Sequence, residues 1–95
     1  GKKDPRIVRI NKFRLEMIAS GHMALINNVD KPGSIGEIGL TLGRHNINIA
    51  KMQVGQEEDG DRNIIFLTTD TPIQPKVVDE MHALPLVKSV TILEF

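Results

Sequence analysis

The sequence predicts an α+β fold, a four-stranded antiparallel sheet with both of its helices on one face. From residue 22 onward, periodic patterns follow in the order strand, helix, strand, strand, helix, strand. Breakers precede each helix, at Pro32-Gly33 and at Pro72 to Pro75. The 95 residues contain three Phe and no Trp or Tyr, so the core must be mainly aliphatic, which suits a sheet covered by helices. Two crossover units in this order give a ferredoxin-like βαββαβ sandwich.

A short β-hairpin is predicted before this unit, in residues 1–20. Arg6 to Ile10 and Phe13 to Met17 are predicted as strands, the second because apolar and charged residues alternate along it. Asn11-Lys12 is interpreted as a two-residue turn between them. Ala19-Ser20-Gly21 has the composition of a linker, so we place a boundary near residue 20 and the main domain at residues 21–95.

The first strand and helix of the main domain flank the Pro-Gly pair. His22 to Asn27 is predicted as a strand at a sheet edge, which invites a partner because an unpaired edge has free backbone groups. Ser34 to Arg44 is predicted as a helix, with Pro32 at or near its first turn. Asn46 follows its end, where Asn tolerates the left-handed conformation. The apolar residues at helical spacing are Ile35, Ile38 and Leu42.

Three strands and a second helix complete the unit. Ile47 to Gln56 is predicted as a strand with a bulge near Lys51, because its apolar phase changes there. Asn63 to Thr69 carries a nearly continuous apolar run, which is typical of a central strand. A helix follows Pro75, and Val87 to Glu94 alternates as the last strand. The apolar side of this helix is formed by Val77, Val78, Met81 and Leu84.

Composition limits the kinds of partner. Lys plus Arg and Asp plus Glu both number 12, and this zero net charge argues against nucleic acid or an anionic membrane as a partner. There is no Cys, hence no disulfide and no thiolate site. No apolar run approaches the roughly 20 residues of a membrane span, and we recognise no signal peptide. These features are compatible with a cytoplasmic domain.

Polar side chains gather around the loop before the first helix. Asn28 and Asp30 end one strand, and Asn48 opens a strand that we take to be its neighbour. The Asp30 carboxylate suits an ammonium group, whereas the Asn28 and Asn48 amides suit a carboxylate or a hydroxyl. Helix N-terminal N–H groups, which favour a carboxylate, are expected at Gly33, Ser34 and Ile35. Together these groups predict one small site for a zwitterion.

These residues also have simpler interpretations. Asp30 can be a turn residue or a helix cap, while Asn28 and Asn48 can serve only the loop and the helix end. Three glycines share one face of the first helix, although glycine inside a helix costs about 1 kcal/mol relative to alanine. Close packing against the sheet or another helix is the simpler explanation of these glycines, which are Gly36, Gly39 and Gly43.

The sequence shows no recognisable catalytic or metal-binding pattern. His22, His45 and His82 lack metal-ligand spacing, and no serine lies in a nucleophile-elbow context. The glycine spacing is not the dinucleotide-binding Gly-x-Gly-x-x-Gly. We therefore expect no catalytic residue, no metal site and no cofactor site in these residues.

Several motifs resemble a known family. Asp30-Lys31-Pro32-Gly33, the helix to Arg44 and Asn46-Ile47-Asn48-Ile49-Ala50 resemble the ACT domain, a small regulatory module of amino-acid metabolism, over residues 22–95. Thr41-Leu42-Gly43 and Met52-Gln53-Val54-Gly55 are similar more narrowly to the C-terminal end of the D-3-phosphoglycerate dehydrogenases. The segment from Pro5 to Leu15 resembles the one before that ACT domain in long forms of the enzyme.

This resemblance implies a ligand and a mode of assembly. ACT domains of these dehydrogenases pair side by side into an eight-stranded sheet and bind L-serine, a feedback inhibitor, at the interface. Asn28, Asp30 and Asn48 match the family's polar positions around that ligand. The resemblance further implies that NAD binds only in other domains of the parent enzyme, and that residues 1–20 belong to a preceding domain.

Other functions stay open at this point. The ACT domain of the iron–sulfur L-serine dehydratase β chain is very similar, and a dimerisation module without a ligand would share the pattern. An acylphosphatase-type enzyme would need an anion-binding Arg loop with a nearby Asn. An RNA-binding sheet would need exposed aromatic residues and a basic face. The sequence shows neither of these last two features.

Overall fold

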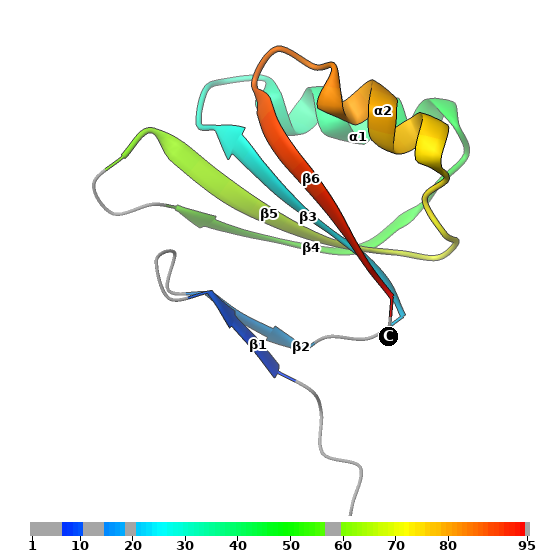
Figure 1. The fold of residues 1–95 in the computed structure, drawn as a ribbon, viewed down its shortest axis with the longest axis horizontal. Coiled ribbons are helices and arrows are strands. Elements are labelled where there is room, and N and C mark those ends of the chain that lie inside the picture. Colours follow the sequence, from blue (N-terminus) through cyan, green and yellow to red (C-terminus); the bar gives the residue numbers. More distant parts are fainter. Residues whose placement is uncertain (1–6, 11–14, 19–20, 57–59, 95) are drawn as a thin grey trace, which may run out of the picture.

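The computed structural model describes residues 7–10, 15–18, 21–56 and 60–94. Four strands form one antiparallel sheet in the order β4-β5-β3-β6. They are β3 (His22–Val29), β4 (Ile49–Gln56), β5 (Arg62–Thr69) and β6 (Val87–Glu94). Helices α1 (Ser34–Arg44) and α2 (Pro75–His82) lie together on one face of this sheet (Figure 1). The predicted ferredoxin-like architecture is confirmed.

The position of β3 corrects one expectation. This strand was predicted at a sheet edge, but it pairs antiparallel with β5 on one side and with β6 on the other. Its backbone groups are therefore used on both sides, and the free edges of the sheet belong to β4 and β6. Strand order depends on pairings between distant segments, which a local hydrophobic pattern does not contain.

Local backbone features agree with the sequence around α1. The helix has the predicted limits, and Asn46 adopts a φ of 58°, the left-handed conformation expected after its end. The bulge predicted near Lys51 is present as a register shift between Ile49 and Lys51. Asp30 does not cap the helix: Gly33, with a φ of 89°, is the N-cap, and no side chain bonds there.

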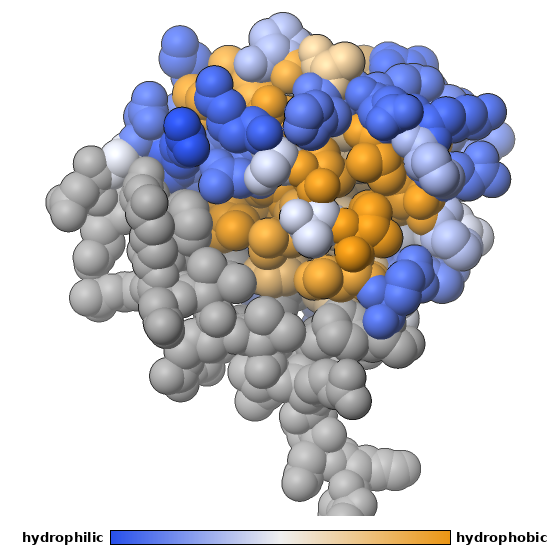
Figure 2. Space-filling view, in the orientation of Figure 1, coloured by the Kyte–Doolittle hydropathy of each residue, from blue (hydrophilic) through white to orange (hydrophobic). Residues whose placement is uncertain are grey.

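The main core lies between the sheet and the two helices. Its members include Ala24 and Ile26 of β3, Ile38 and Leu42 of α1, Ile65 and Leu67 of β5, and Val77 and Met81 of α2. Fully burying such a side chain stabilises the folded state by about 1.5–3 kcal/mol. On the β6 side the cover is incomplete: Val90 and Ile92 are only partly buried, and Figure 2 shows apolar surface in the middle of the view. Neither described helix is long and apolar enough to cross a membrane.

The opposite face of the sheet is covered as well. Met23, Ile64 and Phe66 point away from the main core, yet at most 4% of each is exposed. A separate two-stranded antiparallel sheet, β1 (Ile7–Ile10) with β2 (Leu15–Ile18), lies on this side, with β2 next to β4 (Figure 1). The predicted turn at Asn11-Lys12 lies outside the described residues, and the boundary near residue 20 stays a prediction.

The left-handed residue after α1 offers a test of the backbone. Asn46→Ala should lower the free energy of unfolding by about 1 kcal/mol, because a Cβ-bearing residue other than Asn or Asp is strained there. Asn46→Gly should unfold at the wild-type urea concentration or above it. An equal decrease in the free energy of unfolding in both variants would instead show that the missing Asn side chain causes the destabilisation.

The hairpin offers a second test. A two-stranded sheet is marginal in water by itself, so amide protons of β1 and β2 should exchange with deuterium faster than those of β3 and β5. Hydrogen exchange followed by NMR, on a variant shown by sedimentation to be monomeric, measures this directly. Equally slow exchange in the hairpin and the central strands would count against a boundary near residue 20.

Candidate functional site

The loop between β3 and α1 is held in place by backbone hydrogen bonds. The Asp30 N–H donates to the Asp61 carbonyl (2.7 Å), and the Val29 N–H donates to the Leu86 carbonyl (2.8 Å). Within the loop, the Lys31 N–H donates to the Val29 carbonyl (3.0 Å). Two neighbouring connections of the chain therefore fix the point at which Asp30 leaves the sheet.

The side chain of Asn28 supports this loop through hydrogen bonds. The side chain is fully buried, and its Nδ2 lies 3.0 Å from the Val29 carbonyl, 3.0 Å from Ser34 Oγ and 2.9 Å from Asn63 Oδ1. Its Oδ1 is buried and has no hydrogen-bond partner. In this structure the amide serves the loop, as the simpler interpretation expects, and a contact with a ligand would require the side chain to move.

The start of α1 has fewer free donors than expected. The Ser34 N–H donates to the Lys31 carbonyl (3.2 Å), and Ser34 itself is buried. The first helical bond runs from the Glu37 N–H to the Gly33 carbonyl (3.0 Å). No helical carbonyl precedes the N–H groups of Ile35 and Gly36, so these are the donors that the helix start can offer to an anion.

Asp30 is exposed and has one side-chain partner. Its Oδ2 accepts a hydrogen bond from Gln56 Nε2 at 2.7 Å, and Gln56 is the last residue of β4. Sequence reasoning missed both Gln56 and Asn63. The available signal was the position of these amides, since Asn63 directly precedes the apolar run of β5 and Gln56 closes β4, which pairs with it.

Asn48 lies at the other end of the sheet from Asp30. Strand β5 separates β3 from β4, and Ile49 and His22 pair with the same residue, Thr69, so β3 and β4 start at the same level and run in the same direction. Eight residues of strand span about 26 Å. The expectation that Asn28, Asp30 and Asn48 end adjacent strands around one volume is wrong for a single chain. Asn48 Nδ2 instead donates to Asp70 Oδ2 at 2.8 Å.

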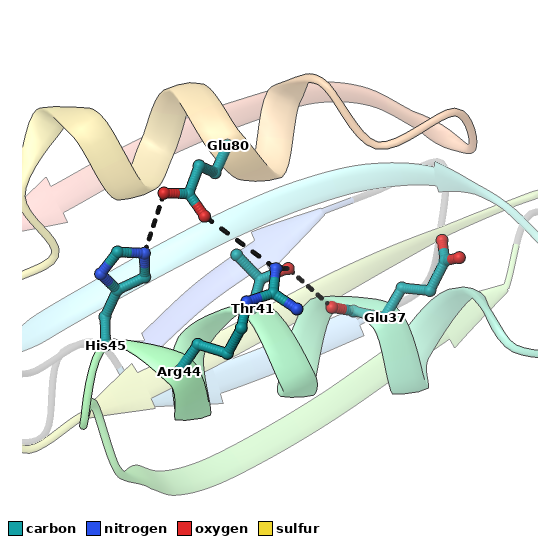
Figure 3. Close-up of polar contacts among 5 residues, drawn as sticks. All are labelled: Glu37, Thr41, Arg44, His45 and Glu80. Atoms are coloured by element: carbon teal, nitrogen blue, oxygen red, sulfur yellow. Dashed lines mark hydrogen bonds and ion pairs between the residues drawn. The ribbon is translucent and has the colours of Figure 1, made fainter.

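One flank of α1 is occupied by α2. His45 Nε2 lies 2.9 Å from one carboxylate oxygen of Glu80, and Arg44 Nη2 lies 4.0 Å from the other (Figure 3). Thr41, on the same side of α1, donates from its hydroxyl to the Glu37 carbonyl at 2.9 Å. These contacts identify the flank of α1 that faces the second helix.

The glycines of α1 lie on its opposite flank. At about 100° per residue, Gly36, Gly39 and Gly43 point away from Thr41 and therefore away from α2. A Cβ added at any of the three would meet no atom within 4 Å. Close packing inside the chain, the simpler explanation of these glycines, is therefore wrong. Large apolar side chains are also exposed on α1 and on β4, at Leu40 (63%) and Val54 (39%).

Metal chemistry has no support in the described part of the chain. Among residues 7–10, 15–18, 21–56 and 60–94, no three His, Asp or Glu side chains lie together as metal ligands would. His22 faces Glu94 at 2.8 Å, and His45 faces Glu80. The chemistry that this region offers is hydrogen bonding and charge.

Comparison with known proteins assigns the fold to a family. Residues 22–86 match the ACT domain family. The chain is also similar to D-3-phosphoglycerate dehydrogenases: 39% identical over 89 residues to that of Bacillus subtilis, 37% over 91 residues to that of Archaeoglobus fulgidus, and 34% over 89 residues to that of Methanocaldococcus jannaschii. Each alignment covers 94% of this chain and 17% of the relative.

Fold and sequence therefore agree, since the matched segment runs from the first strand of the four-stranded sheet to the loop before its last strand. The chain belongs to the ACT domain family.

Proposed function

We propose that this chain is a regulatory domain that binds L-serine between two copies of itself. The observation that carries the proposal is the separation of Asp30 and Asn48 in one chain, together with the free edge of β4. An amino-acid site that uses both residues needs a second copy.

A two-fold pairing through β4 would meet this need. In an antiparallel pair, the start of one strand lies beside the end of the other. Asn48 of the second copy, just before its β4, would then lie beside Gln56 of the first copy, whose amide holds Asp30. The same operation would repeat the site on the other side and extend the sheet to eight strands.

The glycine flank of α1 supports the same interface. The flank faces away from α2, which packs on the β6 side of the helical layer, so it lies toward the β4 edge. Small residues let two helix backbones approach closely. Contact with α1 of a second copy would offset the helical cost of Gly36, Gly39 and Gly43, which no close packing among the described residues explains.

The ligand follows from the groups at this junction. Serine has an ammonium, a carboxylate and a hydroxyl within a few ångströms of one another. Asp30 would take the ammonium, and the helix start after Gly33 and Ser34, mainly the Ile35 N–H, would take the carboxylate. Asn48 of the second copy would bind a remaining oxygen of serine, while Asn28 would hold the loop in place through its hydrogen bonds.

The relatives suggest the larger protein to which this regulation belongs. They are named D-3-phosphoglycerate dehydrogenases, and this chain spans 17% of their length. We propose feedback control of such an NAD-dependent oxidoreductase of serine biosynthesis in the cytoplasm, with catalysis in other domains. Serine would favour one arrangement of paired ACT domains and thereby shift the population of active enzyme.

A dimerisation module without a ligand is the second candidate. The Asp30 carboxylate already accepts a hydrogen bond from Gln56, so the loop is satisfied in part without any bound molecule. Such a module would dimerise through the same surface and would not respond to amino acids.

The interface can be tested with a glycine of α1. The wild-type chain should be a dimer in sedimentation equilibrium at micromolar concentration. Gly39→Glu should be a folded monomer, because its side chain meets open space within the chain and a partner helix in the dimer. Thr91→Glu, at an exposed position of the opposite edge strand β6, is the control and should stay dimeric. A wild-type chain that is monomeric at high micromolar concentration, with and without serine, would refute the interface.

The ligand can be tested by calorimetry with a panel of L-amino acids. Serine should bind best. Asp30→Ala should weaken its binding by about tenfold to a thousandfold, since removing one member of a desolvated charge pair costs about 2–5 kcal/mol. Asn48→Ala should weaken the free energy of serine binding by about 1–3 kcal/mol, as expected for loss of a neutral hydrogen-bond partner. Asp79→Ala, an exposed acid of α2, is the control. Unchanged serine binding by Asp30→Ala would show that the pocket is wrong.

Mixing two variants tests whether the site is shared between copies. A heterodimer of Asp30→Ala with Asn48→Ala would contain one doubly altered site and one intact site. The mixture should therefore regain wild-type affinity at up to half the stoichiometry. If both residues acted within one chain, the mixture would bind no better than its components.

A further inference from the structure

A cavity lies beside the start of α2, next to Asn48 in the chain and at the far end of the sheet from Asp30. It encloses about 300 Å³ and is lined by His45, Ile47, Thr71, Pro72, Gln74, Lys76 and Val77. This volume is at the lower end of the range for small-molecule pockets. None of these residues belongs to the proposed amino-acid site, although Ile47 adjoins Asn48 in the chain.

The cavity has a small apolar side. Pro72, in the loop before α2, is exposed and lines the cavity. Ile47 is 8% exposed, and Val77, which is 1% exposed, lies behind it in the main core. A short hydrocarbon portion of a ligand could lie against Pro72 and the exposed part of Ile47.

The polar side of the cavity carries one cation, Lys76. None of the described residues that line it is an Asp or a Glu, and His45 contributes an imidazole. Among the described residues, the Thr71 hydroxyl, the Gln74 amide and the Lys76 ammonium have no hydrogen-bond or ion-pair partner. Glu80 of α2 is engaged by His45 and Arg44, and Asp70 is engaged by Asn48.

The backbone at the start of α2 contributes little to this side. Pro75 has no N–H, and the N–H of Val77 donates to the Gln74 carbonyl at 2.9 Å. Recognition of a ligand would therefore depend on side chains that converge from the end of α1, the segment before β4, the β5–α2 loop and α2 itself.

We propose that this cavity binds a small organic anion, with a carboxylate held by Lys76, Gln74 and Thr71 and an apolar body on Pro72 and the exposed part of Ile47. A single cation with two neutral donors suits one anionic group, and the lack of an acid among the lining residues disfavours an ammonium. The ligand class is thus a carboxylate with a short apolar chain, which distinguishes this site from the zwitterion site at Asp30.

The probes are butyrate, acetate and inorganic phosphate, titrated into the ¹⁵N-labelled wild-type chain and followed by NMR. Butyrate should give saturable shifts at Thr71, Gln74, Lys76 and Val77. It should bind more tightly than acetate, because two more methylenes are buried. Phosphate should bind more weakly than butyrate if the apolar side contributes, and tighter binding of phosphate would refute that contribution.

Two lysine variants decide whether the effect is specific. Lys76→Gln should weaken butyrate binding by about tenfold, as expected for loss of one charge-assisted contact. Lys88→Gln, an exposed lysine of β6, should leave it unchanged. Overlapping wild-type and variant spectra away from the substitution would show that both proteins are folded. The proposal would be overturned if the wild type showed no saturable shifts, or if both variants lost the same amount of affinity for butyrate.

Discussion

The direction of β4 relative to β3 is the constraint on which the proposed function depends. Because β5 lies between them and is antiparallel to both, β3 and β4 run the same way, and the end of one is far from the start of the other. Asp30 follows the end of β3, and Asn48 precedes the start of β4. In the proposed assembly, each chain would therefore hold halves of two different sites. A two-fold partner at β4 would reverse the direction of the neighbouring strand, and this reversal would bring the two halves together.

The two flanks of α1 differ in their contacts: one packs against its own chain and the other is open. On one flank, Arg44 and His45 reach Glu80 and tie the end of α1 to α2 within the chain. On the other flank, three glycines weaken the helix, and a Cβ at any of them would meet open space. A helix that is polar toward its own neighbour and small toward solvent is poorly explained by monomer stability. The combination is better explained by a contact outside the chain, next to the β4 edge of the described sheet.

The sequence was most informative where structure is determined locally. The limits of α1, the left-handed Asn46 and the bulge at Lys51 follow from residues a few positions apart, and all three were predicted. The central position of β3 was not predicted, because it depends on pairing with β6, whose paired residues lie 59 to 72 positions further along the chain. The support of the loop was missed for the same reason: Asn28 and Asn63 meet only when β3 and β5 pair.

The loop before α1 is held in place by hydrogen bonds within a single chain, without any contact to a second copy. No side chain caps the helix, and the loop is instead fixed by the buried Asn28 amide and by backbone bonds from Val29 and Asp30. Asn28 Oδ1 is left without a partner, which costs about 1–3 kcal/mol. The two N–H groups of its Nδ2 partly offset this cost and hold the start of the helix against the sheet. Asp30 thus leaves a loop that is fixed by its neighbours, and the residue itself stays exposed. In the proposed dimer, a second copy would have to supply only Asn48 and the exclusion of water.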